Sequence, residues 1–98
     1  MMFGLKEQII ESIKDVLSRN PAVVRAVIFG SRARGDYKYN SDIDLAIYCE
    51  GRLPSGLWLD LDGAAGIYKI DVIDMNSPLE ENFRQRIEEQ GVEIYRRE

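Results

Sequence analysis

The 98-residue chain contains no histidine, and this absence excludes several classes of enzyme. Ser-His-Asp and Cys-His catalysis both need an imidazole, and nearly all protein zinc sites use at least one. Any chemistry here must therefore depend on carboxylates and a metal ion. The chain also has a single cysteine, Cys49, so no internal disulfide can form, and we expect a reducing, cytoplasmic location.

Long apolar runs and excess positive charge are also lacking. No apolar stretch approaches the length of a membrane span, and residues 1–5 lead directly into Lys6 and Glu7, so we expect no signal peptide and no membrane partner. The net charge of −4 argues against direct nucleic-acid binding, which needs a positively charged face. The length predicts a single domain over residues 1–98.

The hydrophobic pattern alternates between helical and strand periods. Helices are predicted over 3–19, over 57–65 and from Ser77-Pro78 to Gln90, with Ser77 as the capping hydroxyl and Gly91 as the stop. Strands are predicted over 23–29, 42–48, 68–75 and 92–95, the last one at an edge. This order of elements is typical of an α/β fold with a mixed sheet of about four strands packed with helices.

The most informative run is residues 30–44. Gly30 and Ser31 end an apolar strand where a short helical turn, Ser31 to Arg34, begins. Glycine lets backbone N–H groups approach a phosphate closely, and a helix start adds partial positive charge. An ordinary strand-to-helix turn capped by Ser31 would have the same geometry. The structural interpretation and the phosphate-binding interpretation therefore coincide here.

Asp42 and Asp44 follow after ten intervening residues, 32–41, at the head of the second apolar strand. Carboxylates at i and i+2 on a strand point to the same face. A solvated strand end is the alternative interpretation, but Asp44 lies inside a run of strand-forming residues that disfavour aspartate. Such oxygen ligands suit Mg²⁺, and a phosphate cradle beside them indicates phosphoryl or nucleotidyl transfer.

Positive charge is concentrated beside this run, at Arg32, Arg34 and Lys38. Arginine is the preferred residue for bidentate contact with a phosphate. We expect at least one of Arg32 and Arg34 to bind phosphate, and the sequence leaves open which one. Either arginine could also be an ordinary solvated residue of a polar turn.

Gly-Ser followed after about ten residues by Asp-x-Asp resembles the signature of the DNA polymerase beta superfamily of nucleotidyltransferases. The resemblance implies the palm-like fold of that superfamily and a third carboxylate on a later strand, for which the chain offers Asp71. Asp74 is a competitor three residues on, but it points to the opposite face at the strand's end, where a turn aspartate is ordinary. Asp42, Asp44 and Asp71 would then be catalytic residues that ligate two Mg²⁺ ions, with ATP as the nucleotide.

The short chain looks like the minimal nucleotidyltransferases, which are paired as antitoxins with a helical HEPN toxin. This resemblance implies a hetero-oligomer in which AMP is transferred from ATP to a tyrosine of the toxin. Two alternatives stay open: a non-catalytic antitoxin that neutralises the HEPN ribonuclease by binding, and a small-molecule adenylyltransferase.

Overall fold

The computed structural model describes residues 2–98. The elements follow in the order α1 (Glu7–Ser18), β1 (Val23–Phe29), α2 (Ser31–Arg34), β2 (Ile43–Cys49), α3 (Leu57–Ala64), β3 (Ile70–Asp74), α4 (Glu81–Gln90) and β4 (Val92–Arg96). The strands form one sheet in the order β3-β2-β1-β4. The pair β2 and β3 is parallel, and β1 is antiparallel to both β2 and β4. The predicted α/β fold with a mixed four-stranded sheet is confirmed.

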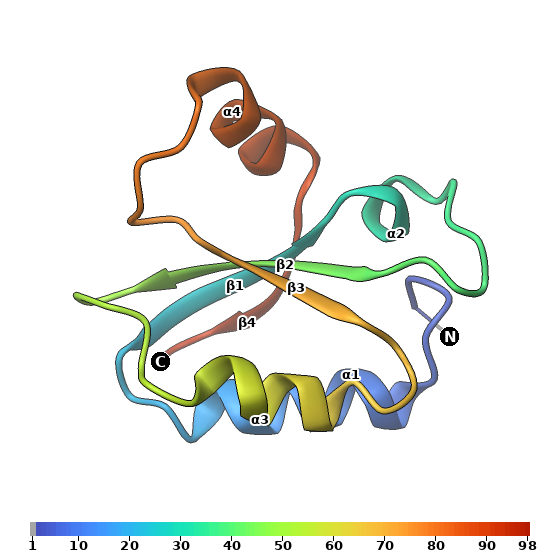
Figure 1. Ribbon diagram of the computed structural model, residues 1–98, viewed down its shortest axis with the longest axis horizontal. Helices are drawn as coiled ribbons and strands as arrows, with labels where there is room; N and C mark the ends of the chain where they lie inside the picture. Colours follow the sequence, from blue (N-terminus) through green and yellow to red (C-terminus); the bar gives the residue numbers. More distant parts are fainter. Residues whose placement is uncertain (1) are drawn as a thin grey trace.

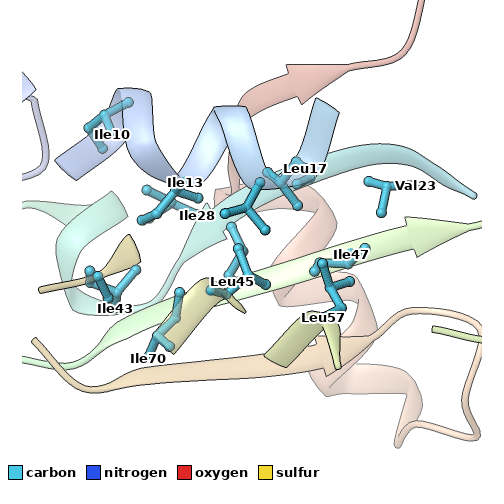
Figure 2. Close-up of a cluster of buried hydrophobic side chains, with 14 of the residues drawn as sticks. Ile10, Ile13, Leu17, Val23, Ile28, Ile43, Leu45, Ile47, Leu57 and Ile70 are labelled. Carbon is cyan, nitrogen blue, oxygen red and sulfur yellow. The ribbon is translucent and has the colours of Figure 1, made fainter. Parts of the chain in front are cut away.

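Helices α1 and α3 cover one face of the sheet, and α4 lies over the other face (Figure 1). Helix α1 buries one stripe, Ile10, Ile13, Val16 and Leu17, against the aliphatic side chains of the strands. The close-up of this core shows Ile13 and Leu17 directed at Ile28 and Leu45 of the two central strands (Figure 2). Burial of these aliphatic groups removes apolar surface from water and anchors the sheet.

The predicted start of the first helix at residue 3 is wrong. Phe3 and Gly4 have positive φ values of 59° and 68°, which a right-handed helix cannot accommodate. Residues 2–5 instead form a turn in which the Leu5 N–H donates to the Met2 carbonyl at 2.9 Å. Helix α1 therefore begins at Glu7.

The predicted cap of the last helix is also wrong. The carboxylate of Glu80 accepts the N–H groups of Asn82 and Phe83 at 3.0 and 3.1 Å, so Glu80 is the N-cap. The Ser77 hydroxyl donates to the Asp74 carbonyl at 2.6 Å and closes the turn after β3. Gly91 does end the helix as predicted, although its backbone is extended rather than left-handed.

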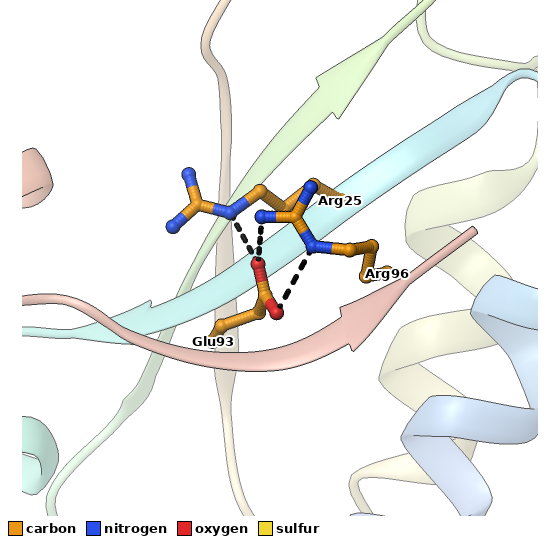
Figure 3. A network of polar contacts seen from close by, with 3 residues as sticks. All are labelled: Arg25, Glu93 and Arg96. Carbon is orange, nitrogen blue, oxygen red and sulfur yellow. Dashed lines mark hydrogen bonds and ion pairs between the residues drawn. The ribbon is translucent and has the colours of Figure 1, made fainter. Parts of the chain in front are cut away.

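Strand β4 forms the predicted edge of the sheet and is tied to β1 by side chains. The Arg25 Nε donates to Glu93 at 2.5 Å, and Arg96 approaches the same carboxylate at 2.8 Å (Figure 3). These hydrogen bonds, from Arg25 first and then Arg96, lower the pKa of Glu93. In the part of the chain from residue 2 to 98, no helix combines the length and apolar content needed to cross a bilayer.

Candidate active site

Two predicted catalytic residues lie side by side on the central parallel pair of strands. Asp44 of β2 is in register with Asp71 of β3, and neighbouring strands are about 4.8 Å apart. Their sequence neighbours Ile43, Leu45 and Ile70 are buried in the core under α1 and α3. Because side chains alternate along a strand, Asp44 and Asp71 point to the opposite face, on the side of α4.

The surroundings of Asp44 disfavour its negative charge. Burial raises the pKa of this carboxyl, and the charges of Asp71 and Asp42 raise it further, while Arg34 lowers it. Asp42 lies just before β2 and is close enough for its charge to act on Asp44. Partly buried carboxylates this close together repel one another, so the group is favourable only when a cation or a proton neutralises part of its charge.

The three carboxylates do not form a ready-made metal cluster. Within residues 2–98, no three His, Cys, Asp or Glu side chains are gathered in a metal-binding arrangement. The electrostatic coupling of Asp44 to Asp71 and Asp42 shows proximity, whereas a shared ion would require the oxygens to converge. The proximity of Asp44 and Asp71 follows directly from the strand register. The all-oxygen donor set and the raised pKa of Asp44 fit a hard cation such as Mg²⁺.

Gly30 lies against Asp44. The residue before it, Phe29, is in register with Asp44 across β1 and β2. A Cβ on Gly30 would come within 3.2 Å of Asp44 Cγ and closer still to Oδ2. The backbone of Gly30, with φ 74° and ψ −153°, is a conformation that only glycine adopts readily. Both geometry and space therefore require glycine here.

Helix α2 begins at Ser31, and Gly30 rather than Ser31 is its N-cap residue. The first helical hydrogen bonds are those from the N–H groups of Ala33 and Arg34 to the Gly30 carbonyl, at 3.1 and 3.0 Å. The N–H groups of Ser31 and Arg32 precede them and have no partner within the helix. Both N–H groups follow directly after Gly30, the residue that lies against Asp44.

The two arginines of α2 have different environments. Arg32 is 2% exposed, and its guanidinium donates to the carbonyls of Phe3, Tyr39 and Ser41, the shortest two at 2.8 Å. Tyr37 and Tyr68 also pack on it, with ring centroids at 5.3 and 4.9 Å. Arg32 therefore holds the fold together. Arg34 is exposed, pairs with Asp36 at 3.5 Å, and its charge acts on Asp44.

Asp74 lies away from this group of residues. It is in register with Ile47 at the other end of β2, and its carboxylate accepts the Asn76 N–H at 2.8 Å. Three residues of extended chain separate it from Asp71 by about 10 Å. Asp74 is thus the last residue of β3, and its carboxylate holds the turn that follows, as expected for the competitor of Asp71.

The structure adds residues of α4 that the sequence pattern did not indicate as site residues. A cavity of about 180 Å³ is bordered by Gly30 and Arg34 and, from α4, by Phe83, Arg86 and Gln90. Their spacing of three and four residues places them on one helix face. That spacing indicates a site only once it is known that this face lies opposite Gly30 and Arg34. A larger hollow of about 450 Å³ runs along α1 and α3, and none of the predicted site residues lines it.

Comparison with known protein families gives one match over most of the chain. Residues 11–98 match the family model described as "Polymerase beta, Nucleotidyltransferase". No curated protein has a sequence that matches the chain.

Several similar solved structures are toxin–antitoxin complexes. A crystal structure of a toxin–antitoxin with AMP-PNP is 26% identical, with a TM-score of 0.75, over 90% of this chain and 73% of that one. A structure of the toxin–antitoxin MntA-HepT is 23% identical, with a TM-score of 0.70, over 94% and 74% of the two chains. A complex of a tri-AMPylated Shewanella oneidensis HEPN toxin with an MNT antitoxin is 20% identical, with a TM-score of 0.71, over 95% and 74%. The last two likenesses establish the fold alone.

The matched family region contains Gly30, Asp44 and Asp71, the residues that strands β1, β2 and β3 bring together. The chain therefore belongs to the polymerase beta family of nucleotidyltransferases and is an enzyme of that class.

Proposed function

We propose that this protein is a Mg²⁺-dependent antitoxin that transfers AMP from ATP to a tyrosine hydroxyl of a HEPN-type toxin. The observation that carries the proposal is the pairing of Asp44 with Asp71 across β2 and β3, with the Gly30 backbone directly against Asp44. The similarity to a toxin–antitoxin structure with AMP-PNP supports the choice of nucleotide and partner.

Each residue has a specific part in this proposal. Asp42, Asp44 and Asp71 would hold Mg²⁺, which when bound supplies charge neutralisation of the phosphates. The N–H groups beside Gly30 and Ser31, together with Arg34, bind phosphate oxygens. We assign no phosphate to Arg32, because its donors are already used by backbone carbonyls.

The reaction is a displacement at the α-phosphorus of ATP. The tyrosine oxygen forms a bond to phosphorus while the bond to the bridging oxygen of pyrophosphate breaks. Asp71 accepts the phenolic proton, and the products are an AMP ester of the tyrosine and free pyrophosphate. The added negative charge would repel RNA phosphates from a ribonuclease site and obstruct it.

Co-expression with the HEPN partner tests this function. Mass spectrometry of the partner should show AMP-sized additions on tyrosine with the parent protein and none with Asp44→Asn. Asp74→Asn is the matched control, since Asp74 lies at the other end of β3 and its carboxylate accepts a hydrogen bond from the following turn, and this variant should modify the partner as the parent does. An unmodified partner in the presence of the parent protein would refute the proposal.

A binding-only antitoxin is the second candidate. It is favoured by one observation, namely that the carboxylates among residues 2–98 are not gathered into a metal cluster. In that case Asp44→Asn would protect cells from the toxin as well as the parent does, with no modified tyrosine in either culture. Loss of protection in Asp44→Asn, with retained binding of the partner, would exclude it.

A further inference from the structure

A cavity between α2 and α4 lies next to Asp44 and has an arginine on each side, Arg34 and Arg86. On one side it is bordered by Phe29, Gly30 and Arg34, and on the other by Phe83, Arg86 and Gln90. Gly30 is common to the cavity and the carboxylates, since it borders the cavity and a Cβ on it would meet the Asp44 carboxylate. A ligand that contacts the Gly30 backbone can therefore reach the carboxylates and the cavity together.

Two apolar residues of α4 determine which of its side chains meet the cavity. The Phe83 ring packs edge-on against Phe29 with centroids 5.9 Å apart, and Ile87 is buried at 1% exposure. Because these two positions face the sheet, Arg86 and Gln90 lie beside them, at the rim that looks toward α2. The orientation of Arg86 thus follows from the packing of its neighbours.

Arg86 is not engaged by the fold. Among residues 2–98, its guanidinium has no hydrogen-bond or ion-pair partner, and the side chain is exposed. Arg84, two residues earlier, is engaged: it donates to the carbonyls of Met75 and Ser77 at 2.8 and 3.1 Å. On α2, Arg32 donates to buried backbone carbonyls, whereas Arg34 has only an exposed ion pair with Asp36. Each helix therefore has one arginine that stabilises the fold and one that borders the cavity.

We propose that Arg86 and Arg34 form a binding site for the β- and γ-phosphates of a nucleoside triphosphate, the part that leaves as pyrophosphate. Two guanidiniums from different elements flank one cavity, and guanidinium matches phosphate oxygens in bidentate geometry. The cavity, at about 180 Å³, is below the ~300 Å³ at which pockets for whole small-molecule ligands begin, so it suits part of a nucleotide. This proposal rests on the proposed nucleotidyltransferase function and adds Arg86 as a specificity residue for triphosphates.

Binding measurements with Mg–AMP-PNP and with AMP test the site. Arg86→Gln should weaken Mg–AMP-PNP binding by about tenfold or more, as expected for the loss of a charge-assisted hydrogen bond, and change AMP binding by less than about twofold. Arg86→Lys should recover part of the loss because it keeps the charge. Arg52→Gln is the control, since Arg52 is exposed in the loop beyond the far end of β2, and it should bind both ligands as the parent does.

The outcomes separate this site from the proposed function. Unchanged Mg–AMP-PNP binding by Arg86→Gln would overturn the phosphate site, and so would an equal loss for AMP, which would place the nucleoside in the cavity. Failure of the parent protein to bind Mg–AMP-PNP would overturn both proposals. Normal binding by the parent without AMP transfer to the HEPN partner would overturn only the proposed acceptor.

Discussion

The two faces of the sheet differ in how much they bury. Of residues 2–98, sixteen buried side chains belong to the core under α1 and α3, and four belong to the cluster under α4. The thinly covered face is the one that carries Asp44 and Asp71. Most of the stabilising burial is therefore on the face under α1 and α3. The face under α4 can hold charged groups that oppose folding.

The difference between the two faces is visible within a single strand. In β2, Ile43, Leu45 and Ile47 are fully buried on the face covered by α1 and α3 (the closed face). Asp44 and Ala46 lie on the face toward α4. Strand alternation makes this possible without any insertion or bulge in the parallel pair.

The largest effect should come from the charged face. Asp71→Asn should reduce AMP transfer by roughly 10³-fold, because a carboxylate that would bind the cation and accept the proton is lost. Asp74→Asn should stay within about threefold of the parent, because it lies at the opposite end of β3. Initial rates of AMP transfer measure both, and the reverse ranking would show that the wrong aspartate has been assigned.

Matched isoleucines on the two faces compare their contributions to stability. Ile47→Ala, at a fully buried position of the closed face, should lower the free energy of unfolding by about 3–4 kcal/mol. Ile73→Ala, at a partly buried position of the α4 face, should lower it by about 1–2 kcal/mol. Chemical denaturation gives both values. Equal losses would mean that the two faces stabilise the protein alike.

The arginines of α2 provide a finer comparison. Arg32→Lys should destabilise the protein by about 2 kcal/mol, because one ammonium group cannot reach the carbonyls of Phe3, Tyr39 and Ser41 together. Arg34→Lys should change stability by less than about 0.5 kcal/mol, since its ion pair is exposed. Thermal unfolding measures both. A larger loss for Arg34→Lys would contradict the assignment of Arg32 to the fold.

The smallest effect should be a gain. The pKa of Asp44 is raised in the folded state, so its ionisation opposes folding, at full strength above the raised pKa and not at all below the unfolded value. Without divalent cations at pH 7, Asp44→Asn should stabilise the protein by up to about 1 kcal/mol, or about 4–8 °C in Tm.

This advantage should disappear as the pH falls through the raised pKa of Asp44, because the parent carboxyl then becomes neutral as well. Thermal unfolding in EDTA at pH 7 and near pH 4 would show it. A mutant that is less stable than the parent at pH 7 would contradict the electrostatic description of the site.

Much of the local structure could be predicted from local patterns. The limits of β1 and α2 are as predicted, since apolar β-branched residues, Gly30 and Gly35 mark them. The N-cap of α4 was predicted wrongly. Ser77 and Glu80 can both cap a helix, but the Ser77 hydroxyl donates to the Asp74 carbonyl in the turn after β3. Hydrogen-bond competition of this kind depends on where the preceding strand ends.

Local sequence patterns are enough to predict most of the elements, the alternation of β2 and the carboxylates beside a Gly-Ser turn. The tertiary fold sets the rest: Asp44 lies opposite Asp71, Arg32 is buried while Arg34 is exposed, and Arg86 borders the cavity. Periodicity encodes which face of an element is apolar, because it acts over neighbouring residues. Which polar side chains meet across segments far apart in the chain depends on strand order and register, and no local pattern contains these.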